Sequence, residues 1–316
     1  MKSRHLQEPA LRYFLEVVRC GSITEASKRL NVAISAISRQ IARLEDLLGT
    51  VLFERRPRGM VLSAAGEVLA AHARKSALEA DRVVSDILAL QGQRSGNVRL
   101  ASTEGFAVEF LPHVIAEFQR SYPEILFQLN VGAPADVTRR VIDGDADIGI
   151  TFSRVPVKGI KVEHRQAAPV VAVMRRDHPL AKFKQVALTQ LQAYPLALPE
   201  PDTTVRQLFD IGCSRQQLLI EPVFSSNYFQ ALFSFAAIGG GISIAGEVSV
   251  RHRVAAGDMV AIRIRDRGMD GRSIEVQTLI GRTLPRAVQT FLDVLKQRVS
   301  EAGAVTAGSA SSTRPA

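Results

Sequence analysis

The chain has 316 residues, of which 46% are hydrophobic and 22% are charged, a composition typical of a globular protein with two or three domains. Its formal net charge of +9 at pH 7 favours a polyanionic partner, without separating nucleic acid from an anionic membrane surface. Two cysteines, Cys20 and Cys213, exclude a disulfide framework and a CxxC metal pair. We find neither the apolar core of a signal peptide nor an apolar run of membrane-spanning length, so we expect a cytoplasmic protein with no membrane partner.

The N-terminal segment carries two short helical patterns in succession. Pro9 suits the first turn of a helix whose apolar stripe ends at Gly21. Ser22 and the glutamate three residues later have the spacing of a capping box, which predicts the start of a second helix, "ITEASKRL". That helix ends at Asn31, a residue that tolerates the left-handed turn conformation.

A third helical pattern, "VAISAISRQIARLEDLLG", follows directly and has two very different faces. Its apolar residues recur at helical spacing: Ile37, Ile41, Leu44 and Leu48. The opposite face presents short hydroxyls and one long cation, Ser35, Ser38 and Arg39, and acidic residues come only later, at Glu45 and Asp46. A helix in a DNA major groove needs such a face, because acids would be repelled by phosphates. An amphipathic core helix would explain the stripe but not this face, so the second and third helices predict a helix-turn-helix.

The next segment, "TVLFERRPRGMVL", has two short apolar runs on either side of an arginine-rich turn. This pattern predicts a β-hairpin wing with Arg55, Arg56 and Arg58 at its tip. Cations there would neutralise phosphates or enter the minor groove, which gives binding a strong salt dependence.

The order of residues from Phe14 to Leu69 closely resembles the DNA-binding half of LysR-type transcriptional regulators. The shared motifs are S-R-Q-I-x-x-L-E at 38–45, L-F-x-R at 52–55 and the serine-started A-G linker helix at 63–66. The resemblance implies a regulator that binds double-stranded DNA at specific sequences. We predict these DNA-binding residues: Ser22, Thr24, Ile34, Ser35, Ser38, Arg39, Arg43, Arg55, Arg56 and Arg58. The family commonly has glutamine at the position of Ile34, so readout there must be apolar.

A long helix is predicted from Ser63 to about Gln91, between a DNA-binding domain of residues 1–62 and a polar hinge. Its apolar seam has heptad spacing: Leu69, Ala73, Ser76, Ala80, Val83, Ile87 and Leu90. The seam suits either a two-helix contact between copies of the chain or packing against the chain's own body. The family resemblance favours a homodimer through this linker of residues 63–93, and further implies a homotetramer and contact with RNA polymerase.

Residues 94–300 alternate strands with helices, which predicts a mainly parallel α/β sheet arrangement. A similar set of elements recurs, and the whole resembles the two-lobed, periplasmic-binding-protein-like effector domain of the same family. We expect the first lobe at about 94–163 and 268–300, and the second at about 164–267. The last residues, 301–316, are small and polar and are expected to be a disordered tail.

Ligands of two-lobed α/β domains bind in the cleft at strand ends and helix N-termini, where free N–H groups favour anions. By this rule we predict effector-binding residues at Ser102, Thr103, Thr151, Thr203, Thr204 and Asn227. The family resemblance implies that the first two hold the carboxylate of a small-molecule effector, although each of the six also suits an ordinary helix cap. Gly246 departs from the family pattern, in which proline is usual.

The sequence carries no recognisable catalytic or metal-binding pattern, so we predict no enzyme, no cofactor and no metal. The six histidines lack metal spacing, and there is no G-x-S-x-G motif and no P-loop. Asp145 and Asp147 are close in sequence but resemble a family turn, and Cys213 lacks a partner for redox sensing. The alternative function is a solute-binding or enzymatic α/β protein with an N-terminal interaction module. The coupled helix-turn-helix, wing and heptad favour the effector-regulated transcription factor.

Overall fold

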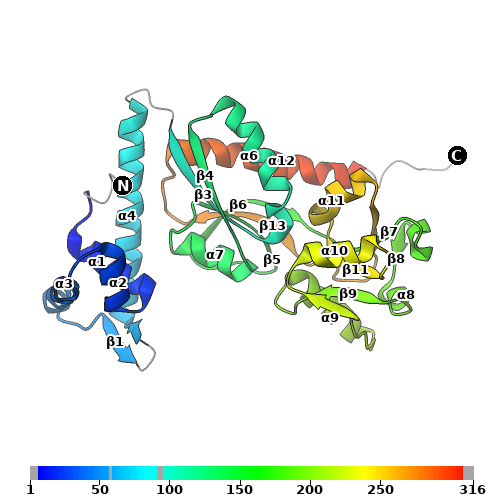
Figure 1. The fold of residues 1–316 in the computed structure, drawn as a ribbon, viewed down its shortest axis with the longest axis horizontal. Coiled ribbons are helices and arrows are strands. Elements are labelled where there is room, and N and C mark those ends of the chain that lie inside the picture. The colour runs from blue at the N-terminus through cyan, green and yellow to red at the C-terminus, as the bar shows by residue number, and fades with distance from the viewer. Residues whose placement is uncertain (1–5, 57–58, 91–94, 309–316) are drawn as a thin grey trace. The chain divides into compact units, whose positions relative to one another are not determined.

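The computed structural model describes residues 6–56, 59–90 and 95–308 and divides into two compact units. The first unit holds the chain up to Ser95 together with Gly281–Arg286, and the second holds Gly96–Ile280 and the residues from Ala287 onwards. Figure 1 shows the order of the elements in both units. Within the described residues, none of the helices combines the length and apolar character needed to cross a bilayer.

The first unit is a helix-turn-helix with a wing and a long helix. Its elements are α1 (Pro9–Cys20), α2 (Ile23–Leu30), α3 (Ile34–Leu48), β1 (Phe53–Arg56), β2 (Gly59–Leu62) and α4 (Ala64–Leu90). Left-handed backbone at Gly21, Asn31 and Gly49 ends the three short helices. Three residues of the predicted apolar stripe of α3, Ile37, Ile41 and Leu44, enter the core that contains Phe14. The fourth, Leu48, is 48% exposed, because it lies in the last turn of α3.

The second unit has two lobes, each built on a mixed sheet. The five-stranded sheet has the order β4-β3-β5-β13-β6, and the six-stranded sheet has the order β10-β9-β11-β7-β12-β8. The strands of the first lobe are β3 (Gly96–Ser102), β4 (Ile125–Val131), β5 (Ile148–Ser153), β6 (Ile160–Ala167) and β13 (Ser273–Leu279). Those of the second lobe are β7 (Val170–Arg175), β8 (Gln185–Val186), β9 (Leu196–Pro199), β10 (Phe224–Ser226), β11 (Ile242–Gly246) and β12 (Met259–Ile264).

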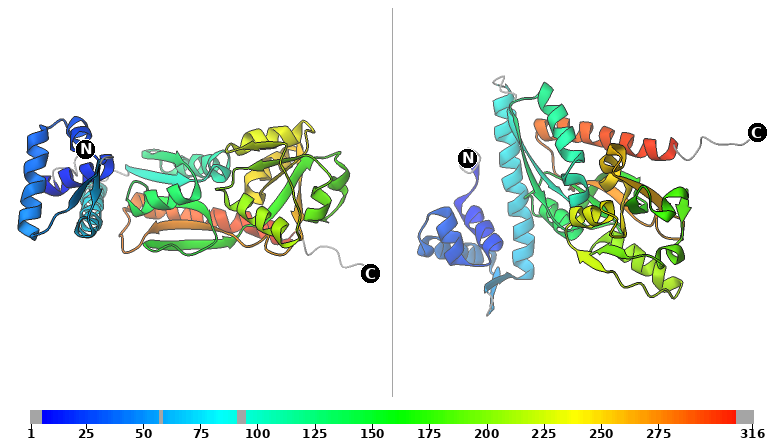
Figure 2. Two further views of the ribbon diagram at one scale, coloured as in Figure 1. Left: turned by 90° about the horizontal axis from the view of Figure 1, so that it is seen from below. Right: turned by 45° about the vertical axis from the view of Figure 1, so that its right-hand side comes forward.

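Helices cover the sheets of both lobes, as the views in Figure 2 show. The helices are α5 (Glu104–Ala107), α6 (Phe110–Ser121), α7 (Pro134–Ile142), α8 (Leu188–Leu191), α9 (Thr204–Arg215), α10 (Phe229–Ala237), α11 (Glu247–Ala256) and α12 (Arg286–Gly308), with a 3-10 turn at Pro179–Lys182. Rings from α6, β4 and α12 pack together in the first lobe: Phe118, Phe127 and Phe291.

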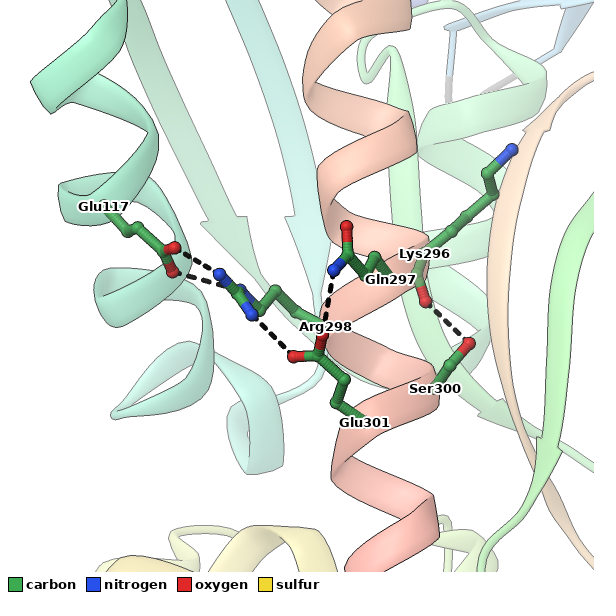
Figure 3. A network of polar contacts seen from close by, with 6 residues as sticks. All are labelled: Glu117, Lys296, Gln297, Arg298, Ser300 and Glu301. Atoms are coloured by element: carbon green, nitrogen blue, oxygen red, sulfur yellow. Dashed lines mark hydrogen bonds and ion pairs between the residues drawn. The ribbon is translucent and has the colours of Figure 1, made fainter.

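The last helix, α12, is tied to both lobes by charged side chains. Arg298 donates to the carboxylates of Glu117 in α6 and Glu301 in its own helix (Figure 3). Arg251 of α11, in the second lobe, donates to the carbonyl of Ala302. These contacts raise the pKa of Arg298 above its ordinary value, because two carboxylates stabilise its charged form.

The chain crosses between the lobes twice, and the two crossings are hydrogen-bonded side by side. The Ala168 N–H donates to the carbonyl of Arg272 at 3.1 Å, and the Val170 N–H donates to the carbonyl of Met269 at 2.8 Å. The predicted lobe boundary at residue 163 is therefore wrong, because it falls inside β6, which pairs with β13 as far as Ala167.

Two further expectations differ from the structure. The sheets are mixed, because strands that return from the other lobe pair antiparallel: β13 with β5 and β6, and β7 with β11 and β12. The predicted tail from residue 301 is helical through Gly308, since α12 continues past its predicted end. The remainder of that tail lies outside the described residues.

Candidate functional site

The exposed face of α3 carries the side chains predicted to read DNA. Ile34 is 48% exposed, Ser35, Arg39 and Arg43 are exposed, and Ser38 is half-buried. The Arg39 Nε–H donates to the Ser35 carbonyl at 3.3 Å, which leaves the other guanidinium nitrogens turned to solvent. The exposed polar side chains, Ser35, Arg39 and Arg43, are therefore accessible to a base edge or a phosphate. Ile34 offers an apolar contact, and Ser38 is less accessible.

The two residues predicted from α2 lie in different settings. The Ser22 hydroxyl caps α2 and accepts from the Glu25 N–H at 3.4 Å. The Glu25 carboxylate accepts from Lys28 Nζ at 2.8 Å instead of completing the predicted capping box. This bond lowers the pKa of Glu25 below its ordinary value. Thr24 is exposed at the start of the same helix.

The wing forms as predicted, and α3 holds its base through an acidic residue. Strand β1 pairs with β2 antiparallel from Phe53 opposite Leu62. The Glu45 carboxylate accepts from the backbone N–H groups of Leu52 at 2.7 Å and Phe53 at 3.4 Å, so this acid is held at the base of the wing.

Of the three wing arginines, Arg56 is exposed and donates to the Glu54 carboxylate at 2.9 Å. The backbone of Arg55 lies in β1. The Arg55 side chain and the whole of Arg58 lie outside the described residues.

The first part of the predicted heptad seam in α4 packs into the chain's own N-terminal core. Leu69 and Ala73 belong to the cluster around Phe14. Further along, Ile87 is 48% exposed and Leu90 is 88% exposed. The start of the seam is therefore used within the chain, and a contact between copies through its exposed end stays a prediction.

A cavity of about 260 Å³ lies between the two lobes of the second unit. It is lined by ends of β3, β4 and β11, by the N-terminal turns of α7 and α9, and by the segment before α10. Four of the six predicted effector-binding residues line it: Thr103, Thr203, Thr204 and Asn227. The Thr203 hydroxyl caps α9 by accepting from the Arg206 N–H at 3.2 Å. The N-terminal turn of the twelve-residue helix α9 therefore forms part of the cavity wall.

Ser102 and Thr151, also predicted to bind the effector, do not line this cavity. Ser102 is 0% exposed and its hydroxyl donates to the Thr103 carbonyl at 2.8 Å. Thr151 is 1% exposed and pairs with Glu275 of β13 in the sheet. Both side chains are buried within the first lobe.

Arg272, which the sequence analysis did not identify, is a buried cation in the cavity wall. It is 2% exposed, and its Nε–H donates to the Ala168 carbonyl at 2.9 Å while Nη1 donates to the Thr204 hydroxyl at 3.1 Å. Its guanidinium carbon lies 4.1 Å from the ring centroid of Phe152. Burial lowers the pKa of Arg272 to about 9, so the side chain remains charged at neutral pH.

Glu104 connects the lobes on the other side of the cavity. Its carboxylate accepts from the backbone N–H of Phe229 at 3.0 Å and of Gln230 at 3.2 Å. Glu104 belongs to the first lobe and α10 to the second, so the N-terminus of α10 already has an anionic partner from within the chain.

Asp147 and Cys213 have structural rather than catalytic surroundings. Asp147 is 2% exposed, and its carboxylate accepts from the Arg99 backbone N–H at 2.8 Å and from the Arg99 guanidinium at 2.6 Å. Cys213 is buried in the core of the second lobe. Burial raises the pKa of this thiol to about 11, with help from the negative charge of Asp210 and Asp266. Within the described residues, no cluster of three potential metal ligands occurs.

Comparison with known proteins gives matches over both units. The family model described as "LysR substrate binding domain" matches residues 91–300, and that of "Bacterial regulatory helix-turn-helix protein, lysR family" matches residues 9–67. The HTH-type transcriptional regulator YfeR of Shigella flexneri is 30% identical over 234 residues, 74% of this chain and 76% of YfeR.

Two solved structures illustrate the similarity in fold. Full-length OxyR from Pseudomonas aeruginosa superposes with a TM-score of 0.69 at 19% identity and covers 91% of this chain and 93% of its own. The regulatory domain of CcmR from Synechocystis PCC6803, in complex with 2-PG, has a TM-score of 0.55 at 25% identity. That match covers 64% of this chain and 97% of the CcmR chain.

Proposed function

Because the chain belongs to the LysR family of transcriptional regulators, we propose that a small carboxylate, bound between the lobes of its second unit, controls how it binds DNA. The protein is a DNA-binding transcriptional regulator with an effector-binding domain and is not an enzyme. What remains to be assigned is the chemistry of the effector, the residues that read DNA and the assembly.

The inter-lobe cavity is the observation that carries the proposal. Residues from both lobes line it, so a ligand bound there contacts both at once and favours one arrangement of the lobes over another. A buried arginine and the N-terminus of α9 both favour an anion. The CcmR regulatory domain, whose fold is similar, was solved in complex with 2-PG, so a domain of this fold holds a bound ligand.

We assign DNA reading to α3 and phosphate contacts to the wing. The exposed Ser35, Arg39 and Arg43 would meet base edges or phosphates in the major groove, while Arg56 would contact the backbone. Two copies joined through the accessible end of α4 would hold two reading helices at a fixed separation. We further propose that the homodimer pairs into a homotetramer, that it contacts RNA polymerase and that the protein is cytoplasmic.

To test this function, fragmented genomic DNA of the source organism is incubated with the purified protein, and the DNA that the protein retains is sequenced. We expect enrichment of a few short sites with two-fold symmetry. Arg39→Ala protein serves as the control, since it retains the wing but loses the long cation of α3. Uniform, salt-sensitive recovery by both proteins would contradict sequence-specific regulation.

A further inference from the structure

Arg272 is a buried cation whose described partners are all neutral. Its hydrogen bonds go to a backbone carbonyl and a threonine hydroxyl, and its Nη2 has no partner among the described residues. A buried charge without a counter-ion is costly, and proteins rarely keep one unless something binds it. Two partly buried arginines of the same unit do face carboxylates: Arg99 faces Asp147 at 2.6 Å and Arg206 faces Asp210 at 2.8 Å. Arg272 therefore lacks an anion that the fold itself does not supply.

The geometry of Arg272 restricts how an anion can reach it. The single Nε–H is occupied by the Ala168 carbonyl, so a side-on fork through Nε and Nη2 is excluded. One face of the guanidinium lies on Phe152. The remaining approach is end-on, at the Nη2 edge. Nη2 lies beside Gly246, and both Gly246 and Arg272 line the cavity.

Gly246 is the residue that makes room for this edge. A Cβ added at Gly246 would lie 2.2 Å from Arg272 Nη2, which is far closer than two such atoms can approach. The backbone of Gly246 is extended and would accept another residue. The absence of a side chain at this position therefore serves the placement of Nη2.

A second unsatisfied donor lies in the same cavity wall. Thr103 is 7% exposed and its hydroxyl has no hydrogen-bond partner among the described residues. Together with Nη2 it offers two donors, which matches the two oxygens of a carboxylate. The N-terminus of α10 is already occupied by Glu104, so the free anion site is on the Arg272 side of the cavity.

We propose that Arg272 is the specificity-determining residue of the effector site, and that it binds a small monocarboxylate end-on through Nη2, with the Thr103 hydroxyl on the second oxygen. The inference rests on the proposed function for the location of the effector. The cavity, at about 260 Å³, is smaller than sites for drug-sized ligands, roughly 300–1,000 Å³. Val131, Pro134 and Phe229 give it an apolar lining for a compact body. Glu104 and Asp202 also line it and disfavour a second negative charge on the ligand.

Calorimetric titration of the full chain tests the proposal with defined probes. Sodium benzoate and sodium cyclohexanecarboxylate are the carboxylates, benzamide is the neutral analogue and inorganic phosphate is the competing anion. We expect at least one carboxylate to bind the wild-type protein, and benzamide and phosphate to bind at least about 10-fold more weakly. Arg272→Met should weaken carboxylate binding by roughly 10- to 100-fold, the effect of losing one charge-assisted hydrogen bond.

Two further variants keep the result interpretable. Gly246→Ala retains the arginine but displaces Nη2, so it should weaken binding in the same way even if Arg272→Met fails to fold. Arg140→Met removes an exposed arginine of α7 that does not line the cavity, and it should bind like the wild type.

Wild-type affinity in Gly246→Ala and in folded Arg272→Met would overturn the proposal, as would preferential binding of phosphate or no binding of either carboxylate. A different result, the absence of an enriched genomic site, would contradict the proposed function. If the carboxylates bind through Arg272 but no genomic site is enriched, the anion site stands and the assignment of regulation by this ligand is wrong.

Discussion

Arg39 and Arg56 are exposed cations of the same unit, but their positions predict different losses on substitution. Arg39 lies on the exposed face of α3 that we propose reads DNA, and Arg56 lies in the wing strand β1. Arg39→Ala should weaken binding to an enriched site by roughly 5- to 150-fold, the discrimination of one good base contact, and leave non-specific binding nearly unchanged. Arg56→Ala should weaken specific and non-specific binding alike, because a phosphate contact carries no sequence information.

Fluorescence anisotropy with an enriched site and a scrambled duplex, each over a range of salt concentrations, measures both effects. The slope of log affinity against log salt should fall in magnitude by about 1 for Arg56→Ala. An equal loss on both duplexes for Arg39→Ala would show that this arginine contacts phosphate rather than a base.

Cys213 is predicted to be unreactive in the folded protein. Burial raises its pKa to about 11, so roughly one thiol in a thousand is ionised at pH 8. Iodoacetamide at pH 8 should modify Cys213 slowly without denaturant and rapidly in urea, as followed by peptide mass spectrometry. Rapid modification of the folded chain would contradict the burial that we describe.

The same thiol gives a signed pH dependence of stability. The folded chain holds the thiol proton more tightly than the unfolded chain, in which the pKa is near 9.0. The unfolded state therefore loses this proton first, and the Cys213 contribution to stability declines as the pH rises from about 9 to about 11. Cys213→Ser should flatten this part of a curve of denaturation midpoint against pH.

At the residue scale, the cavity was only partly predictable. Thr203, Thr204 and Asn227 follow a rule about strand ends and helix starts, which is visible in the sequence. Arg272 follows no such rule, because it lies in a crossing segment and becomes part of the site only when Ala168 and Gly246 are brought beside it. No spacing in the sequence records those two contacts.

At the scale of elements, Glu45 links α3 to the wing, and its neighbour Asp46 provides a matched control. Glu45→Ala should remove two hydrogen bonds to backbone N–H groups of the wing and lower the free energy of unfolding by about 1–3 kcal/mol. Asp46→Ala makes the same change of charge at an exposed position and should stay within about 0.5 kcal/mol.

Urea denaturation followed by circular dichroism measures both variants. Equal stabilities would mean that the carboxylate bonds do not hold the wing to α3. The two variants lose the same charge, so any difference between them in DNA affinity reports the position of the wing rather than repulsion by phosphates.

Helices with one clear apolar face were predicted well, and elements without one were missed. The third helix, read as 32–49, is Ile34–Leu48 in the structure. Strand β6, "IKVEHRQA", was not predicted because it is an edge strand with many exposed charged side chains. Helix α11, "EVSVRHRVAA", buries only Val250, so its sequence lacks the stripe on which a helix prediction depends.

At the scale of the effector-binding unit, the two lobes are joined through the crossing segments and through side-chain contacts, so a ligand bound among these contacts would act on their arrangement. The paired crossings at Ala168 and Arg272 form one connection, and Arg272 itself bonds to both Ala168 and α9. An anion on Nη2 therefore acts on the residue that links the crossing to a helix of the second lobe. Coupling of this kind needs only that the ligand binds one arrangement better than another.

Glu104 forms another connection between the lobes, and its removal should loosen them without unfolding either one. Glu104→Ala deletes the carboxylate that accepts from Phe229 and Gln230 at the start of α10. Hydrogen exchange at these two amides should accelerate by about 10-fold or more, the effect of losing a hydrogen bond to a charged group.

Glu221→Ala, at an exposed residue of the second lobe, is the matched control and should leave exchange unchanged. Mass spectrometry of peptides that cover α10, with and without sodium benzoate, measures the exchange. Wild-type rates in Glu104→Ala would show that the start of α10 is held in place without this carboxylate, and the proposed role of Glu104 in joining the lobes would be wrong.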